Sequence, residues 1–455
     1  MHLNMDSESK HFVKIRGKTA GSVTSNVLSL AGRNVMQVEI GTEENKSIKP
    51  IDGENFANAA KIAHEQGMPL VCFVESSGAD ILEGVAAVHS WGTAAKELVR
   101  CSGKVPVIFC VTGATVSGPA LLLGLADFVI MIEDSYAFVS GPQMAELFTG
   151  ETTNSEDLGG ASLHDRTTGV SHFIVSDLDE GKELIRELLS FLPDSAYEIP
   201  QGWDSNDAPD RSTPEAGDIL PSSISDSYDV RDVINCVVDD NYILESRKNW
   251  APNIITAFAS IGGRPIGVVA NQPQSMAGTL DIPASQKGAR FVSFCDSFNL
   301  PLVTFVDTSG FYPGKDLEWR GMIRYGAQMA FAYARSTVPR VCLILRKSYG
   351  GAYIVMDSRY MGNDLMLAWP SAEIAVMGAK GAVEILHRDA SDEEKLSLES
   401  HYEEKLLNPF VAAERGSVDR IIEPSETRSE IASALALLSE KKERLPKRKH
   451  DNIPL

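Results

Sequence analysis

Two adjacent glycines, Gly350 and Gly351, follow an apolar run over residues 341–345 that predicts a buried strand. Where a parallel strand turns into a helix, a glycine pair lets backbone N–H groups approach a ligand without interference from a Cβ atom. Such paired donors, at the positive end of the helix, stabilise an oxyanion and need no titrating side chain. For an isolated glycine pair, the alternative interpretation is close backbone packing without a ligand.

The first half of the chain contains a second turn of the same kind. Ser117-Gly118 follows another apolar run and matches Gly350-Gly351 at an offset of roughly 230 residues, which is the period of an internal repeat. Nearly the same offset brings residues 68–78 onto residues 300–310, where Pro, Leu, Val, Phe, Val, Ser and Gly recur. The sequence therefore predicts a tandem duplication, and the repeated turn favours two oxyanion sites over packing glycines.

The sequence offers no catalytic base to accompany these turns. No Ser-His-Asp order stands out and no histidine pair has metal-ligand spacing, so we expect no metal site on this chain. His164, His387 and His401 are scattered, and we expect them to be structural or at the surface. The base is therefore expected to come from the substrate or from a cofactor.

The residues around the turns alternate between strand and helix patterns. In the second half, residues 266–270, 302–306 and 341–345 are typical of buried strands, and residues 284–298 and 321–337 have apolar residues at helical spacing. Continuous β-branched runs separated by helices predict a parallel sheet covered by helices on both faces. Each half is therefore expected to form an α/β domain.

The composition is that of a globular, acidic protein. The 455 residues are 43% hydrophobic and 23% charged, and the formal net charge of −20 argues against nucleic acid or an anionic membrane surface as partner. Residues 105–132 are apolar but interrupted by glycines and by Pro119, which predicts a buried strand, a turn and a helix instead of a membrane span. Six cysteines without a Cys-x-x-Cys spacing, and an acidic N-terminus unlike a signal peptide, predict reduced thiols and a cytoplasmic protein.

The middle of the chain differs in composition from both halves. Residues 196–229 are rich in Asp, Ser and Pro and have neither the helical nor the strand period. We therefore predict a first domain over residues 1–200, a linker over residues 201–227 and a second domain over residues 228–455.

The second half resembles the carboxyltransferase (beta) subunit of biotin-dependent acyl-CoA carboxylases, the propionyl-CoA and acetyl-CoA carboxylase beta-chain type. The matching segments are residues 268–273, 277–282, 287–291, 294–296, 321–327, 350–353, 368–370, 375–382 and 408–416. The first half matches more thinly, at Glu83-Gly84, Asp127-Phe128, Gly141-Pro142, Thr149-Gly150-Glu151, Leu158-Gly159-Gly160 and Ser171-His172.

This resemblance implies two tandem crotonase-like (ClpP/crotonase) domains and a homo-hexamer built as a trimer of dimers. The site would lie between the first half of one subunit and the second half of its partner. Carboxybiotin would release carbon dioxide there, the freed ureido group would take the α-proton of an acyl-CoA, and the enolate would attack carbon dioxide. The chain contains no Ala-Met-Lys-Met-like biotinylation motif and no ATP-binding domain. Biotin carboxylase and the biotin carboxyl carrier protein are therefore expected on other chains.

The resemblance also assigns roles to individual residues of the second half. Gly351 and Ala352 would be the backbone donors on the biotin side, and Gly350 would give the turn room. Tyr353, Ile354 and Tyr325 are expected to contact substrate. The residue after Gly-Gly-Ala-Tyr helps to set acyl length in this family, and isoleucine resembles the forms that accept acetyl-CoA. In the first half, Ser117 and Gly118 would hold the matching donors on the acyl-CoA side.

Three departures from the family pattern fall in the first half. Ser117 replaces the first glycine of the expected pair, and Asp80 stands where the family has arginine. The chain also lacks the family's initial segment, and residues 46–55 replace a segment that contains Phe-Gly-Gly. The acyl side is therefore expected to differ from the family, while the biotin side is intact.

Three alternatives to an active carboxyltransferase stay open at this point. The chain could be a catalytically weak or structural subunit of a mixed carboxylase complex. It could be a biotin-linked acyl-CoA decarboxylase that runs the transfer backwards. It could also be a biotin-independent crotonase-like enzyme.

Overall fold

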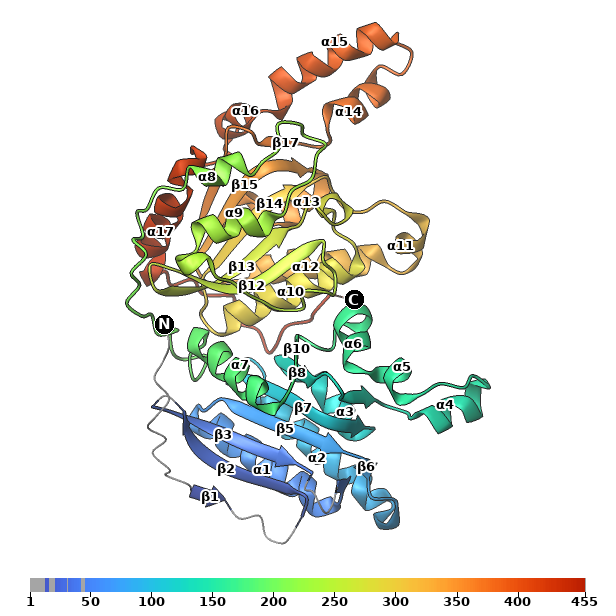
Figure 1. Ribbon diagram of the computed structural model, residues 1–455. Helices are drawn as coiled ribbons and strands as arrows, with labels where there is room; N and C mark the ends of the chain where they lie inside the picture. The colour runs from blue at the N-terminus through green and yellow to red at the C-terminus, as the bar shows by residue number, and fades with distance from the viewer. Residues whose placement is uncertain (1–12, 16–20, 31, 42–45, 455) are drawn as a thin grey trace. The chain divides into compact units, whose positions relative to one another are not determined.

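The computed structural model describes residues 13–15, 21–30, 32–41 and 46–454, with the backbone alone for residues 13–15. The chain forms two compact units (Figure 1). The first unit comprises Met1–Ile199 with Arg247–Trp250, and the second comprises Pro200–Ser246 with Ala251–Leu455.

Within the described residues, the first unit contains an eight-stranded sheet. In spatial order its strands are β1 (Val13–Ile15), β2 (Val23–Leu30), β3 (Arg33–Ile40), β5 (Leu70–Ser76), β7 (Val107–Val116), β8 (Phe128–Ile132) and β10 (Phe173–Val175), with β9 (Tyr136–Phe138) beside β7. The β1–β2 and β2–β3 pairs are antiparallel, and the remaining pairs are parallel. Because parallel strands end at one edge of a sheet, the residues that follow β5 and β7 lie close together.

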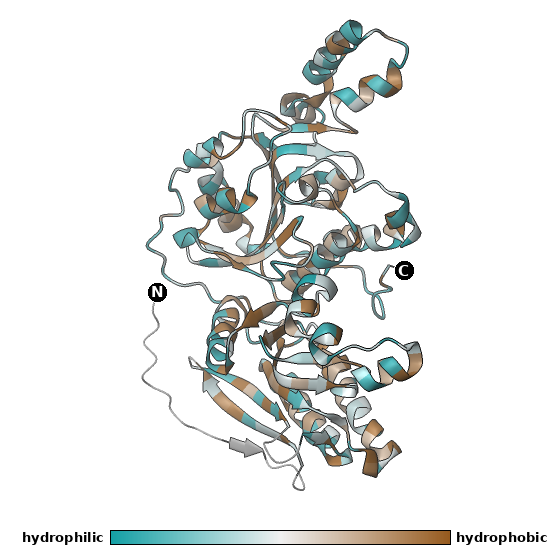
Figure 2. Cartoon of the chain, turned by 45° about the vertical axis from the view of Figure 1, so that its right-hand side comes forward, coloured by the Kyte–Doolittle hydropathy of each residue, from teal (hydrophilic) through white to brown (hydrophobic). Residues whose placement is uncertain are grey.

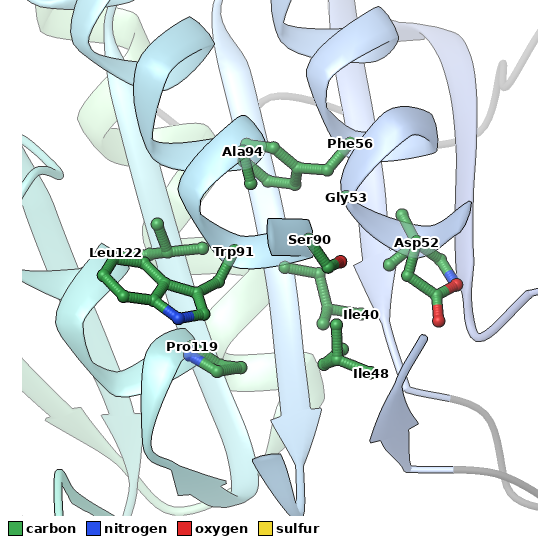
Figure 3. A pocket seen from close by; sticks show the side chains of 11 residues that line it. Ile40, Ile48, Asp52, Gly53, Phe56, Ser90, Trp91, Ala94, Pro119 and Leu122 are labelled. Atoms are coloured by element: carbon green, nitrogen blue, oxygen red, sulfur yellow. The ribbon is translucent and has the colours of Figure 1, made fainter. Parts of the chain in front are cut away.

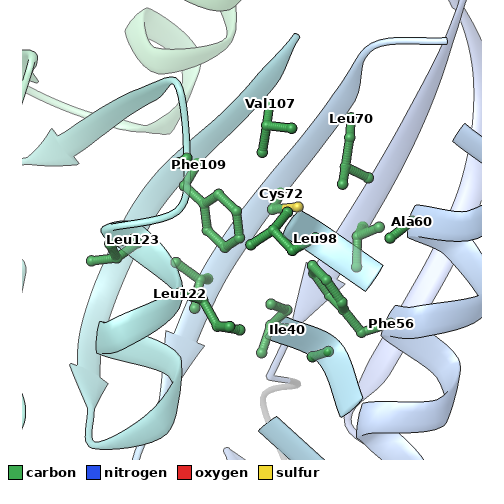
Figure 4. Close-up of a cluster of buried hydrophobic side chains, with 14 of the residues drawn as sticks. Ile40, Phe56, Ala60, Leu70, Cys72, Leu98, Val107, Phe109, Leu122 and Leu123 are labelled. Atoms are coloured by element: carbon green, nitrogen blue, oxygen red, sulfur yellow. The ribbon is translucent and has the colours of Figure 1, made fainter. Parts of the chain in front are cut away.

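Helices cover both faces of this sheet. They are α1 (Pro50–Gln66), α2 (Val85–Cys101), α3 (Gly118–Leu123), α4 (Pro142–Thr149), α5 (Ser155–Gly159), α6 (Ala161–Leu163) and α7 (Leu178–Phe191). Figure 4 shows Phe56 of α1 and Leu98 of α2 packed with Phe109 of β7, and the rings of Phe56 and Phe109 lie 6.4 Å apart. The next residue, Cys110, faces Gly181 of α7, because alternate side chains of a strand point to opposite faces.

The second unit repeats this order of strands. In spatial order they are β11 (Leu244–Glu245), β12 (Ile254–Ile261), β13 (Arg264–Asn271), β14 (Leu302–Thr308), β15 (Arg340–Tyr349), β16 (Leu365–Ala368) and β18 (Arg420–Ile421), with β17 (Glu373–Ala375) beside β15. Antiparallel strands again lead into parallel ones, and β14 and β15 take the places of β5 and β7. The predicted duplication and the α/β fold of each half are confirmed.

The helices predicted in the second half are also present. The helices of this unit are α8 (Glu215–Asp218), α9 (Val230–Val237), α10 (Ile282–Ser297), α11 (Lys315–Trp319), α12 (Met322–Arg335), α13 (Gly350–Val355), α14 (Ala379–Leu386), α15 (Asp392–Tyr402), α16 (Pro409–Glu414) and α17 (Thr427–Leu437). Helix α10 begins after Asp281, whose carboxylate accepts the Ala284 N–H at 2.9 Å. Helices α10 and α12 correspond to the two predicted helical segments.

The segment predicted as a linker, residues 201–227, packs along the second unit. The Trp203 N–H donates to the Gly263 carbonyl at 2.9 Å. The fully buried guanidinium of Arg428 donates to the Ala208 carbonyl at 2.9 Å. The segment is therefore fixed to this unit by contacts that are distant in sequence. The predicted domain limits themselves stay a prediction.

The apolar stretch at residues 105–132 forms β7, α3 and β8, as the sequence indicates. Figure 2 shows hydrophobic residues along the strands of each sheet. Among the described residues, no helix is long and apolar enough to cross a membrane. All cysteines are unpaired thiols, and five of the six are buried.

Candidate active site

The turn after β7 in the first unit has an unusual backbone. Ser117 adopts φ 64° and ψ −126°, a region that L residues other than glycine rarely occupy. Its N–H donates to the Phe138 carbonyl at 2.9 Å, so that donor is already engaged. Helix α3 follows at once with Gly118 and Pro119. At this turn, the Gly118 N–H is therefore the backbone donor that can face a ligand.

The turn after β15 in the second unit has a similar φ angle at the matching position. Gly350 has φ 60°, close to the value at Ser117, and α13 follows. Within the described residues, the N–H groups of Gly351 and Ala352 have no hydrogen-bond acceptor. Two adjacent donors without partners at the edge of a parallel sheet can bind an oxygen that carries negative charge.

An aromatic ring covers the glycine of each turn. A Cβ atom on Gly118 would lie 2.5 Å from Cγ of Trp91, which comes from α2. A Cβ atom on Gly351 would lie 3.3 Å from Cε2 of Phe311, which follows β14. Position 118 therefore requires glycine because the indole occupies the space of any side chain, and position 351 has little room.

Proline at position 119 is a feature that the sequence interpretation missed. The repeat places Pro119 opposite Ala352, and proline has no N–H. The second turn therefore presents two adjacent backbone donors, whereas the first presents the Gly118 N–H followed by a residue that cannot donate. The signal was present in the sequence, because extending the alignment of the two turns by one residue shows it.

A buried ion pair supports the second turn. Asp307 and Arg346 are 0% and 3% exposed in their side chains, and the Arg346 Nε donates to the Asp307 carboxylate at 2.9 Å. The Tyr228 hydroxyl donates to the same carboxylate at 2.9 Å, and burial together with the Asp307 charge raises the pKa of this phenol. Arg346 also donates to the carbonyls of Ser223 and Asp226, and these hydrogen bonds fix the segment before α9 to the ends of β14 and β15.

A different ion pair occupies the matching place in the first unit. Glu75, at the end of β5, pairs with Lys46, which precedes β4 (Ser47–Ile48). Strand β4 pairs with β6 (Gly78–Ala79), so the segment from residue 46 crosses the strand ends. Asp80 accepts the Leu82 N–H at 3.0 Å and caps a short 3₁₀ helix. The carboxylate that replaces an expected arginine therefore has a structural use in this unit.

The predicted substrate residues of the second unit lie on two elements. Tyr353 and Ile354 are on α13, and burial raises the pKa of the Tyr353 phenol to about 12. Tyr325, on α12, packs in an apolar cluster with Phe311. Since a Cβ atom on Gly351 would lie 3.3 Å from the Phe311 ring, the same ring is close to both Tyr325 and the turn.

A small cavity adjoins the first turn (Figure 3). Its volume is about 20 Å³, room for roughly one water molecule. Trp91, Pro119 and Leu122 are among its lining residues, and so is Ser90, whose hydroxyl is buried without a hydrogen-bond partner among the described residues. The cavity is too small for an acyl chain. In the described part of the chain, no group of three His, Cys, Asp or Glu side chains is arranged to hold a metal ion.

Comparison with known proteins gives one consistent result. The family model described as carboxyl transferase domain matches residues 8–453. The propionyl-CoA carboxylase beta chain of Saccharopolyspora erythraea is 43% identical over 429 residues, which cover 90% of this chain and 78% of the relative. The methylmalonyl-CoA decarboxylase subunit alpha of Veillonella parvula is 41% identical over 415 residues, covering 91% and 81%. A crystal structure of a hexameric transcarboxylase 12S, with methylmalonyl-coenzyme A and methylmalonic acid bound, has a TM-score of 0.94 at 38% identity and covers 98% of this chain and 90% of its own.

Proposed function

Because the chain belongs to the carboxyl transferase domain family, as an acyl-CoA carboxyltransferase subunit of a biotin-dependent carboxylase, we propose that it works through an enolate held by backbone N–H groups. Its two halves are crotonase-like, as in transcarboxylase 12S. The observation that carries the proposal is the pair of N–H groups on Gly351 and Ala352, which have no acceptor in the part of the chain that the structure describes. These donors can stabilise negative charge without a titrating group.

The second turn is proposed to bind the ureido group of biotin. The residues fit that role, because two N–H groups without acceptors match one carbonyl oxygen, and Gly350 adopts the positive φ that opens the turn. Carboxybiotin, presented by a carrier protein, would supply the carbon dioxide, and the freed biotin would then be the base. Gly351 and Ala352 would hold the ureido oxygen and favour the charge that develops on it.

The first turn is proposed to bind the thioester of the acyl-CoA. When the base takes the α-proton, the C–H electron pair forms the C=C bond of the enolate and the carbonyl π pair moves onto the thioester oxygen. The Gly118 N–H would stabilise that oxygen, and the α-carbon would then form its bond to carbon dioxide. Ile354, which is 36% exposed on α13, is proposed to limit acyl length. A short acyl-CoA is the proposed acceptor.

The assembly is proposed to be a homo-hexamer, a trimer of dimers, in the cytoplasm. Each site would combine the first half of one subunit with the second half of its partner. Exposed apolar side chains at the ends of matching helices support subunit contacts: Leu147 and Phe148 on α4, and Ile385 and Leu386 on α14. Biotin carboxylase and the biotin carrier would come from other chains.

The test uses the purified chain with malonyl-CoA or methylmalonyl-CoA and free biotin. Biotin-dependent decarboxylation is expected. Ala352→Pro should lower kcat by roughly 10²–10³-fold, because it removes one oxyanion donor. The fold should accept this proline, since Pro119 occupies the matching position. Ala352→Ser keeps the N–H and is the matched control. An Ala352→Pro variant with the kcat of this control would refute the donor role.

A second candidate function is a catalytically weak or structural subunit. The observation that favours it is Pro119, which leaves the acyl side with one backbone donor fewer than the biotin side. This candidate predicts no turnover by the isolated chain with any of the acyl-CoA esters. It also predicts that adding biotin changes nothing.

A further inference from the structure

We propose that the Ser117 side chain supplies the hydrogen bond that Pro119 cannot give, so that its hydroxyl is a catalytic group on the acyl side. The inference rests on the proposed function and names a side chain of the first turn that holds the thioester oxygen. It concerns the Ser117 Oγ atom, because the Ser117 N–H is already bonded to the Phe138 carbonyl.

The backbone at Ser117 gives the first argument. At φ 64° and ψ −126° a serine is strained, whereas the matching Gly350, at φ 60°, is not. Glycine at position 117 would therefore fit the turn better than serine. A serine kept in a conformation that glycine would adopt without strain points to a use for its side chain.

The ordinary use of serine before a helix does not apply here. An N-cap serine has extended backbone angles, and its oxygen accepts an N–H of the first turn of the helix. Ser117 has a positive φ, and within the described residues its side chain makes no capping bond. One of the usual donors is also absent, since the second helical residue is Pro119. The hydroxyl is therefore available to a ligand.

The surroundings of Ser117 leave no other polar side chain in the turn. Val116 is apolar, Gly118 is held as glycine by the Trp91 ring, and Pro119 has no N–H. On its other side, Ser117 lies against Gly78 after β5, where a Cβ atom would be only 3.4 Å from that of Ser117. Because residue 78 is a glycine, it puts no side chain beside the Ser117 hydroxyl. This hydroxyl lies at the edge of the sheet where the parallel strands end, which is where such sheets bind ligands.

The chemistry requires a donor that keeps its proton. As the α-proton moves to the base, the thioester oxygen gains the electron pair, and Ser117 Oγ–H and the Gly118 N–H would both donate to it. When the enolate carbon bonds to carbon dioxide, the C=C pair forms the new bond and the pair on oxygen re-forms the thioester C=O. Ser117 forms no covalent bond, and the acyl side again has two donors.

The experiment compares decarboxylation of methylmalonyl-CoA with free biotin in full-length variants. Ser117→Ala should lower kcat by roughly 10²-fold with little change in KM, because it removes one oxyanion donor. Ser117→Gly should lower kcat equally while raising Tm, since glycine relieves the strain. In the Ser117→Ala background, Pro119→Ala should recover part of kcat by restoring an N–H. Ser102→Ala, at an exposed serine in the same unit, is the control.

The outcomes separate this inference from the proposed function. If the unmodified chain is active and Ser117→Ala matches Ser102→Ala in kcat, the hydroxyl role is overturned and the proposed function stands. If Ser117→Gly has full activity, the side chain is not needed and the inference is also overturned. A chain without biotin-dependent turnover would overturn both.

Discussion

The buried pair of Asp307 and Arg346 leads to a quantitative prediction about stability. Arg346→Met removes the guanidinium but keeps much of its apolar volume. Among the described residues, the fully buried Asp307 carboxylate would then keep its hydrogen bonds from the Tyr228 hydroxyl at 2.9 Å and the Lys347 N–H at 3.2 Å, and no cation would be hydrogen-bonded to it. Breaking a buried pair by removing one partner costs about 3–5 kcal/mol, because a charge is left uncompensated.

That loss translates into a measurable change in thermal unfolding. For a unit of this size, a loss of 1 kcal/mol lowers Tm by roughly 2–4 °C, so Arg346→Met should lower it by about 6–20 °C. Arg320→Met is the matched control, because Arg320 pairs with Asp316 at 3.3 Å on the surface, where a pair contributes about 0–1 kcal/mol.

Calorimetry of the full chain, at fixed protein concentration, would measure both variants. A second substitution, Asp307→Asn in the Arg346→Met background, should recover part of the loss, because no charge then remains buried without a partner. If the Tm of Arg346→Met lies within about 2 °C of that of the Arg320→Met control, the stabilising role of the pair is refuted. That difference corresponds to about 1 kcal/mol or less, because 1 kcal/mol shifts Tm by about 2–4 °C.

Three further predictions concern other sites. Gly118→Ala should abolish turnover and lower Tm, since its Cβ atom would lie 2.5 Å from the Trp91 ring. Gly124→Ala is the control, because the atom nearest to its Cβ atom would lie 3.4 Å away. Equal effects of the two substitutions would contradict the packing argument. Burial raises the pKa of Asp357 to about 6 from 3.8, so folding takes up a proton between these values. The free energy of unfolding, measured relative to Asp357→Asn, should therefore rise as pH falls from 7 to 5, and a fall would contradict the assignment. Ile354→Ala should raise the kcat/KM ratio of butyryl-CoA to acetyl-CoA by roughly 10-fold or more, and an unchanged ratio would remove Ile354 as a limit on acyl length.

The fold could be predicted because its signals are local. The strands at residues 302–306 and 341–345 are short β-branched runs, and the helices between them show the helical period. The duplication needs only a comparison of the chain with itself. The family resemblance, confirmed by the match over residues 8–453, also depends on contiguous motifs.

The parts that could not be predicted depend on contacts between distant residues. Trp91 reaches Gly118 from another helix, and no spacing in the sequence indicates that contact. Residues 201–227 have no apolar period, yet buried Arg428 fixes them to the second unit. The positive φ angle of Ser117 likewise could not be predicted, because from sequence alone such an angle is expected at glycine and not at serine.

The two units supply a cation to the carboxylate at matching strand ends in different ways. Glu75 and Asp307 occupy matching strand ends, and in the second unit the cation, Arg346, lies on the neighbouring strand. The repeat places Gly113 at that point of the first unit, where a Cβ atom would lie only 2.6 Å from the Glu75 carboxylate carbon. The strand carries no cation at this position, and Lys46 reaches the carboxylate from a separate segment. Lys46 thus supplies, from outside the sheet strands, the partner that this partly buried carboxylate needs, whereas Arg346 supplies it from the strand in the second unit.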